Sequence, residues 1–297
     1  MKRAAVFAHY DKDSIIDDYV IYYIENLKKI ADIVVFVSCN NLSDEEKMKL
    51  DVNHIISEEH KEYDFGSYKR GFLYLKNNNL LSDIDELIFA NDSCYAPLFP
   101  FEDMFDKMGK EQCDFWGVTE DKYGLIKNPR RKNKYKRCYN PHLQSYFIVI
   151  KKQVIESEAF NKFIENIKQE TSKNDVIINY EIGLSNQLEA NGYRYSQYIK
   201  SKYRPGNIMI NKWEKVLTKD LCPFLKCSLI RGYDYLYVDI SETESLIESI
   251  SNYPINIIKN NLKRTKLPEK YPNLPKVIKI FYYYISRRFK FFKNNCF

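Results

Sequence analysis

Short apolar runs alternate along the chain with segments whose apolar residues recur at helical spacing. Uninterrupted runs lie at residues 4–8, 33–37, 87–90 and 146–150, and residues 52–56 form a weaker, interrupted one. Runs of this length predict strands that are buried on both faces. Between the first two runs, residues 14–30 repeat apolar side chains at the spacing of an amphipathic helix. Strands that alternate with helices indicate right-handed crossovers, and therefore an α/β fold whose central, mostly parallel sheet is flanked by helices.

The second half of the chain is less regular. Residues 114–120 predict a strand that runs into a loop, and a helix is expected to begin near Glu181 and to end at Gly192. Residues 124–139 are polar and basic without periodicity, which predicts either a loop on the working face or a solvated charge run. Residues 206–229 predict a short helix, a turn and another helix.

The pattern divides the chain into three parts. We expect a main α/β domain at residues 1–235, a helical extension at 236–265 and a basic, aromatic tail at 266–297. In the tail, bulky apolar residues interleave with Lys and Arg, which is typical of a helix that lies on a membrane surface. A C-terminal helix packed on the protein's own core is the alternative.

Composition narrows the classes of function. Apolar residues make up 44% and charged residues 29% of the 297, as in soluble globular proteins. The net charge is +6, but from Leu262 onward ten Lys and Arg residues stand against the single acid Glu269. The rest of the chain is therefore near neutral, which argues against nucleic-acid binding. The basic tail instead favours an anionic membrane surface.

Cysteine usage and hydropathy indicate a compartment. The seven Cys residues are scattered without a CxxC pair, which fits reduced thiols. The apolar run after Met1-Lys2-Arg3 is too short for a signal peptide, and no run approaches the roughly 20 apolar residues of a membrane span. We therefore expect a cytoplasmic protein, peripheral on the inner face of the plasma membrane.

The clearest candidate chemistry follows the apolar run at 87–90. That predicted strand ends at Asn91-Asp92-Ser93, three small residues with oxygen-bearing side chains. Open α/β sheets bind ligands at the carboxyl ends of their strands. Hard oxygen ligands suit Mg²⁺ or Mn²⁺ bound together with substrate phosphates, so Asp92 is a candidate metal ligand. The alternative is an Asx turn that closes the strand.

A second candidate lies in the segment Tyr63-Asp64-Phe65-Gly66-Ser67-Tyr68-Lys69-Arg70. A helix that starts after Gly66 and carries Lys69 and Arg70 in its first turn would bind a diphosphate. The alternative is an ordinary helix start with solvated cations.

Six motifs in this order resemble those of the rhamnan synthesis F family of bacterial glycosyltransferases. They are YDFGSYKRG, LIFANDSCYAPLFPFEDMF, CDFWGVT, HLQSYFIVIKK, NYEIGLSNQLEANGY and KWEKVLTKDLCPFLKCSLIR. The resemblance runs from about Lys2 to Gly232 and implies the GT-A nucleotide-sugar transferase fold. Asn91-Asp92-Ser93 then takes the place of the usual DxD motif with a single carboxylate, and Glu181 falls at the position of the catalytic base.

The resemblance implies a role for each site residue. Asp92 and Glu181 are expected to be catalytic, with Asp92 as the metal ligand. Donor-binding residues are expected to be His9, Tyr10, Ser38, Asp64, Gly66, Ser67, Lys69, Arg70, Asn91, Asp92 and Ser93. Acceptor-binding residues are expected to be Trp116, Gly117, Thr119, Gln144, Ser145 and Tyr180.

The implied reaction is transfer of a sugar with inversion from a nucleotide donor, by resemblance dTDP-L-rhamnose, to a lipid-linked cell-surface polysaccharide. Such a transfer needs one carboxylate to deprotonate the acceptor hydroxyl and positive charge to stabilise the leaving diphosphate. Mg²⁺ or Mn²⁺ is the expected cofactor. The alternatives are a retaining or hexose-specific transferase of the same fold, and a non-catalytic scaffold in a polysaccharide assembly complex.

Overall fold

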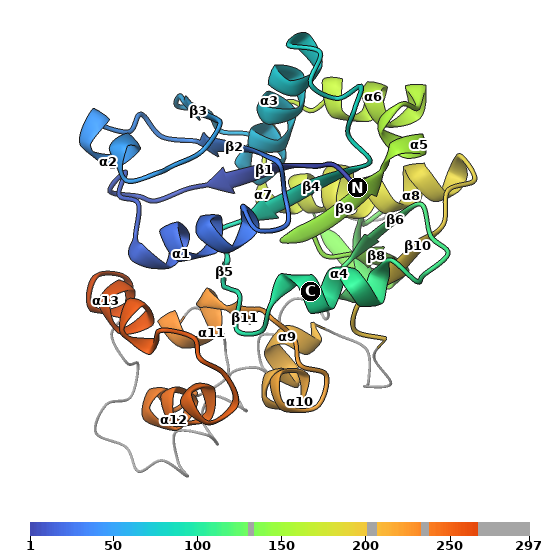
Figure 1. Cartoon of the computed structure of the whole chain (residues 1–297). Coiled ribbons are helices and arrows are strands. Elements are labelled where there is room, and N and C mark those ends of the chain that lie inside the picture. Colours follow the sequence, from blue (N-terminus) through green and yellow to red (C-terminus); the bar gives the residue numbers. More distant parts are fainter. Residues whose placement is uncertain (130–133, 201–206, 233–237, 267–297) are drawn as a thin grey trace.

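A computed structural model describes residues 1–129, 134–200, 207–232 and 238–266. Its centre is a seven-stranded sheet with the order β10-β6-β9-β4-β1-β2-β3 (Figure 1). These strands are β1 Arg3–His9, β2 Ile33–Ser38, β3 His54–Ser57, β4 Glu86–Asn91, β6 Phe115–Gly117, β9 Phe147–Lys151 and β10 Tyr195–Gln197. Only β9 runs antiparallel to its neighbours in this sheet. The expected α/β fold with a mostly parallel sheet is confirmed.

Helices cover both faces of this sheet. The α-helices of the described residues are α1 Asp18–Leu27, α2 Asp44–Met48, α3 Tyr63–Asn77, α4 Phe101–Met108, α5 Lys152–Ile155, α6 Glu158–Glu165, α7 Lys173–Val176, α8 Gly183–Ala190, α9 Ile208–Asn211, α10 Trp213–Thr218, α11 Cys227–Arg231, α12 Ile240–Ile250 and α13 Ile255–Thr265, of which α9 to α13 lie in a further layer beyond α1 and α4 (Figure 1). Two apolar cores follow from the alternation of side chains along β1. Phe7 packs on the face of α1 and α4, while Val6 packs on the face of α3 and α6 (Figure 1). Because both faces are covered, β1 and β4 read as uninterrupted apolar runs.

The prediction of a loop over residues 124–139 is wrong. Strands β7 Glu120–Lys127 and β8 Tyr135–Leu143 form an antiparallel hairpin, paired from Glu120 opposite Leu143 to Lys127 opposite Tyr135. Most of its side chains are exposed or half-buried, so no apolar alternation marks the strands in the sequence. The backbone hydrogen bonds of the hairpin, rather than a buried face, define it.

The starts of two helices also differ from the predictions. α1 begins at Asp18 rather than near Ser14, because Ser14 has φ 57° and Asp11 Oδ1 accepts the backbone N–H groups of Asp13 and Ile15. α3 begins at Tyr63, so Gly66 lies inside its first turns. There a Cβ would come within 2.3 Å of the Glu62 Cβ, which explains the glycine without a special backbone angle.

The segment around Glu181 is helical earlier than predicted. α7 runs into a π-helical turn, η1 Ile177–Ile182, and then into α8, so Glu181 does not lie in a first helical turn. Gly192, with φ 87°, follows the end of α8 as expected.

Two short strands and two helices complete the described chain. β5 Cys94–Tyr95 pairs antiparallel with β11 Leu225–Lys226, where the sequence predicted a turn between two helices. The predicted helical extension contains α12 and α13, and the division at residue 235 stays a prediction. The predicted tail lies outside the described residues from 267 onward. Within the described part of the chain, no helix has both the length and the hydropathy to cross a membrane.

Candidate active site

A cavity of about 500 Å³ opens at the carboxyl ends of β1 and β4. The chain passes from β1 to β2 on one side and later places β4 on the other side, so the strand order reverses between β1 and β4. Such a reversal is where open α/β sheets bind ligands. The polar and charged residues that line the cavity include Tyr10, Asp64, Asn91, Asp92, Ser93, Gln144, Ser145, Glu181, Lys226 and Arg231.

A second hollow of about 580 Å³ lies around Arg3, Asp32 and Phe105 at the opposite end of the sheet. Two of its three cations are already paired, because Arg3 Nε donates to Glu86 Oε2 at 2.6 Å and Lys28 pairs with Asp51, and the third, Lys29, donates to Asn26 Oδ1 at 2.9 Å. The cavity at the carboxyl ends is therefore the better candidate for an active site.

Asn91-Asp92-Ser93 forms one wall of that cavity at the end of β4. Asn91 Oδ1 accepts Ser93 N at 3.1 Å and Ser93 Oγ at 2.6 Å, so the Asx turn is present. This turn directs the Asp92 carboxylate toward the end of β1, where Asp92 Oδ2 accepts the Tyr10 N–H at 2.9 Å. Burial raises the pKa of Asp92, while the nearby charges of His9 and Arg231 oppose that rise.

Glu181 and Asp64 form the opposite wall with Ser145 between them. Glu181 Oε1 accepts Ser145 N at 3.2 Å, and Ser145 Oγ donates to Asp64 Oδ2 at 3.4 Å. Asn91 Nδ2 also donates to Asp64 Oδ2, at 3.0 Å, which connects this wall to the end of β4. Burial raises the pKa of Glu181, and the Asp64 carboxylate reinforces the shift. Burial likewise raises the pKa of Asp64. A carboxyl whose pKa is raised in a cavity is suited to accept a proton from a bound hydroxyl.

Lys226 and Arg231 bring positive charge to the same cavity, and the sequence reasoning assigned neither a role. Lys226 Nζ donates to Ser93 Oγ at 3.1 Å and lies 3.9 Å from the centre of the Tyr146 ring. Arg231 Nη2 donates to Asn261 Oδ1 at 2.9 Å. The only signal in the sequence was their presence in the last quoted motif, KWEKVLTKDLCPFLKCSLIR.

Several residues that the sequence assigned to the donor do not line the cavity. Lys69 and Arg70 lie two turns inside α3, where Lys69 Nζ donates to the Ile167 carbonyl at 2.7 Å and Arg70 pairs with Glu58 and Glu62. Four other residues that were expected to bind the sugar donor are buried and do not line the cavity. They are His9, Ser38, Gly66 and Ser67. There the His9 Nδ1 to Ser38 Oγ distance is 3.2 Å.

The expected acceptor residues separate into two groups. Gln144 and Ser145 line the cavity. Trp116, Gly117 and Thr119 are buried in or beside β6, with the Trp116 ring packed edge-on against Phe105 at 5.0 Å. Tyr180 is also buried, and its hydroxyl donates to Glu170 Oε1 at 2.9 Å. These four residues can support the cavity wall but do not face its interior.

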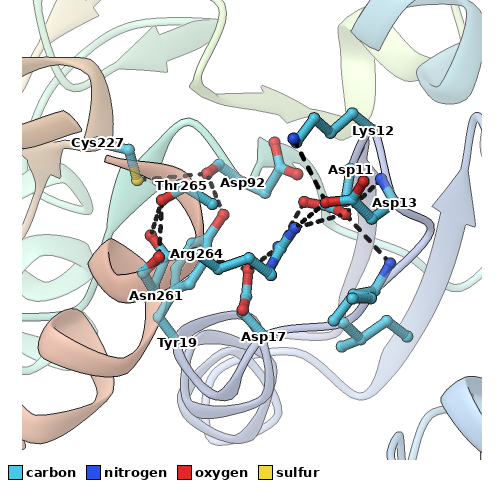
Figure 2. Close-up of polar contacts among 12 residues, drawn as sticks. Asp11, Lys12, Asp13, Asp17, Tyr19, Asp92, Cys227, Asn261, Arg264 and Thr265 are labelled. Carbon is cyan, nitrogen blue, oxygen red and sulfur yellow. Dashed lines mark hydrogen bonds and ion pairs between the residues drawn. The ribbon is translucent and has the colours of Figure 1, made fainter. Parts of the chain in front are cut away.

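The loop between β1 and α1 is tied to α13, near the end of the described chain. Figure 2 shows the Arg264 side chain reaching from α13 to three acids of this loop. Arg264 Nη1 donates to Asp11 Oδ1 at 3.1 Å and Asp13 Oδ2 at 2.9 Å. Arg264 Nη2 donates to Asp11 Oδ2 and Asp17 Oδ2, both at 2.6 Å. Asp11 follows Tyr10, so this contact also fixes the amide that holds Asp92.

A sequence model of the rhamnan synthesis protein F family matches residues 34–289, which is most of the chain. The chain belongs to the rhamnan synthesis protein F family. A curated relative in this comparison is the uncharacterized protein y4gN of Sinorhizobium fredii, 28% identical over 204 residues, or 68% of this chain and 49% of the relative. The chain thus spans about half the length of that relative. The expected family is confirmed, and the cavity described above lies largely within the matched residues.

Solved structures share parts of the architecture. Residues 1–349 of TarS from S. aureus match 91% of this family member and 77% of that chain, with 12% identity and a TM-score of 0.38. Core-mannan synthase A from Aspergillus fumigatus, in its Mn/GDP form, matches 61% of this chain and 69% of that chain, with 10% identity and a TM-score of 0.34. These scores are low, so the assignment rests on the family match.

Proposed function

We propose that the chain is a glycosyltransferase that uses a nucleotide-activated sugar, with the cavity at the carboxyl ends of β1 and β4 as its active site. The observation that carries the proposal is the convergence of Asp92, Asp64 and Glu181 with Lys226 and Arg231 on this one cavity. Glycosyl transfer requires both a proton acceptor and positive charge near a diphosphate. Membership in the rhamnan synthesis family supports L-rhamnose as the sugar and a cell-surface polysaccharide as the acceptor.

Glu181 is the proposed general base. Its carboxylate would take the proton of the acceptor hydroxyl as the hydroxyl oxygen attacks C1 of the donor sugar from the side opposite the diphosphate, which inverts the configuration at C1. The Ser145 N–H that donates to Glu181 Oε1 holds the carboxylate in place, and Glu181 Oε2 has no hydrogen-bond partner among the described residues. Gln144 and Ser145 are proposed to contact the acceptor, since both line the same side of the cavity.

Asp92 is the proposed ligand for a divalent cation. Its Oδ2 is held by the Tyr10 amide, and within the described parts of the chain its Oδ1 has no hydrogen-bond partner. No group of three His, Cys, Asp or Glu residues in those parts is arranged to hold a metal. One carboxylate together with substrate phosphates fits the way proteins bind Mg²⁺. When bound, the ion would neutralise charge on the diphosphate.

A screen of nucleotide sugars by thermal shift, with and without Mn²⁺, tests the proposal. A donor that binds the folded state raises the melting temperature by mass action, and hydrolysis of that donor without acceptor then identifies an enzyme.

Asp92→Asn should abolish turnover and remove any dependence of nucleotide binding on Mn²⁺. Asp106→Asn, an exposed change on α4, is the matched control. Binding without hydrolysis or transfer would instead favour the scaffold.

A further inference from the structure

Three cations line the cavity: Lys173 on α7, and Lys226 and Arg231 in the segment of β11 and α11. Lys226 and Arg231 both line the cavity, yet neither forms an ion pair with a carboxylate of the described residues. Arg264, in contrast, pairs with three Asp residues a short distance away in the structure. Cations that face a cavity without a carboxylate partner can pair with an anionic ligand that enters it.

The position of Lys226 is fixed by the backbone. In the β5–β11 pair, Lys226 stands opposite Cys94, which follows directly on Asn91-Asp92-Ser93. The Cys227 N–H donates to the Ser93 carbonyl at 3.0 Å, so this hydrogen bond holds the segment around Lys226 against the end of Asn91-Asp92-Ser93. An ammonium has three N–H donors. Among the described residues, Lys226 Nζ donates to Ser93 Oγ at 3.1 Å and also interacts with the Cys94 thiol, which leaves at least one donor. The Lys226 head group therefore has a donor left for a ligand beside Asp92.

The position of Arg231 is fixed by its neighbours. Arg231 Nε and Nη2 both donate to Asn261 Oδ1, at 3.1 and 2.9 Å, and the guanidinium lies 5.5 Å from the Tyr19 ring centre. Asn261 is buried on α13 and also accepts the Tyr95 hydroxyl. A guanidinium has five N–H donors, so a fixed Arg231 can still donate into the cavity.

We infer that Lys226 and Arg231 form a diphosphate-binding site that neutralises the leaving group of the donor. This inference rests on the proposed transferase function. In the step concerned, the bond between sugar C1 and the diphosphate oxygen breaks, and its electron pair stays on the diphosphate. The acceptor oxygen forms the new bond to C1, and the hydroxyl proton passes to Glu181. Lys226 and Arg231 donate hydrogen bonds to the diphosphate as its negative charge grows.

The site accounts for three observations together. Asn91-Asp92-Ser93 contains a single carboxylate, that of Asp92, so one divalent cation bound there would leave much of the negative charge of the diphosphate uncompensated. Asp64 and Glu181 add negative charge around the same cavity. Lys69 and Arg70, the cations that the sequence favoured, are occupied elsewhere by Ile167, Glu58 and Glu62.

Titration of the protein with inorganic pyrophosphate in EDTA buffer tests anion binding at Lys226 and Arg231 in the absence of a sugar, a nucleotide base and a metal. Lys226→Met should weaken pyrophosphate binding at least about tenfold, as expected for loss of a charged hydrogen bond. Lys226→Arg should retain most of the affinity. Lys219→Met, an exposed change on the loop after α10, should bind like the wild type. Melting temperatures without ligand identify a variant that fails to fold, in which case Lys226→Gln replaces Lys226→Met.

The outcomes separate this inference from the proposed function. Equal binding of pyrophosphate by Lys226→Met and the wild type overturns the inference, as does no binding by the wild type at millimolar pyrophosphate. Wild-type turnover of a nucleotide sugar by Lys226→Met also overturns it but leaves the transferase function standing. Binding that depends on Lys226, with no nucleotide sugar turned over by the wild type, supports the anion site and overturns the transferase function.

Discussion

Glu181 is the residue whose environment most directly predicts a chemical role. Glu181→Gln keeps the shape of the side chain but cannot accept a proton, so transfer should fall by about 10²–10⁴. Donor affinity should stay nearly unchanged, because the base acts on the acceptor. Single-turnover transfer and nucleotide titration measure the two effects separately. Glu189→Gln, an exposed change on α8, is the control. Near-normal transfer by Glu181→Gln would show that another residue is the base, and Asp64 in the same cavity would be the next candidate.

The pH dependence of the reaction follows from the same residue. Burial raises the pKa of Glu181 above the ordinary value of 4.5. A base works only when ionised, so kcat/KM should rise with pH along a limb centred above 4.5, and Glu181→Gln should remove that limb. A limb centred at or below the ordinary value would contradict the assignment.

The free energy of unfolding should fall as pH rises, whereas kcat/KM should increase. Because the folded protein binds this proton more tightly than the unfolded chain, ionisation of Glu181 costs stability as pH rises through its raised pKa. Glu181→Gln should therefore melt at a higher temperature than the wild type near pH 7. The difference should shrink below the ordinary pKa of 4.5, where Glu181 is protonated in both states. Melting curves at several pH values provide the measurement.

At the scale of single residues, the sequence indicated the carboxylates but not the cations. Asp92 stood out because it follows an uninterrupted apolar run, and Glu181 because the family resemblance places it at the position of the catalytic base. Lys226 reaches Ser93 across 133 residues through the pairing of β5 and β11. No local pattern reports such a pairing, so Lys69 and Arg70, which lie close to a glycine in sequence, were favoured instead.

Elements that are buried on both faces were predictable, and elements exposed on both faces were not. β1, β2, β4 and β9 each produced an uninterrupted apolar run. The β7–β8 hairpin left no such pattern, because its side chains are mostly exposed or half-buried. The π-helical turn η1 was also missed, because its apolar residues do not distinguish it from an ordinary helical turn. Single π-helical turns are frequent at functional sites.

The contact between α13 and the loop after β1 should stabilise both the fold and the donor site. Arg264→Met leaves Asp11, Asp13 and Asp17 together without their cation, so the free energy of unfolding should fall by about 1–3 kcal/mol, between the values for exposed and for buried ion pairs. Nucleotide affinity should also fall, because the loop carries the Tyr10 amide that holds Asp92. Denaturant unfolding and nucleotide titration measure the two effects.

Two further variants separate charge from packing at this contact. Lys263→Met on the exposed side of α13 should leave stability and nucleotide affinity unchanged, because among the described residues the Lys263 side chain hydrogen-bonds only to Asn260. Arg264→Met combined with Asp13→Asn should recover part of the stability, since one repelling charge is removed. No recovery, or an equal loss in Lys263→Met, would argue that α13 acts through packing alone.

For the whole molecule, we propose that the basic, aromatic tail holds the enzyme at an anionic membrane. Truncation before Pro275 should leave donor hydrolysis intact, because every residue of the proposed site precedes it. The same truncation should release the protein from anionic vesicles, since each Lys or Arg near such a surface contributes about 1 kcal/mol. Liposome flotation measures the effect, with neutral vesicles as the control. Equal binding by both forms, or binding by neither, would remove the membrane proposal.

The link between Arg264 and Asp11 also bears on how the protein is made. The two residues are separated by 253 positions, so the acidic loop leaves the ribosome long before its cation. At about 5–20 residues per second, the interval is on the order of 10–50 s. Throughout that time Asp11, Asp13 and Asp17 lack the charge that orders them, and the Tyr10 amide beside Asp92 is not yet held. The contacts of Arg264 with this loop therefore form only after synthesis has passed α13, and on the proposed function the donor site would be complete only then.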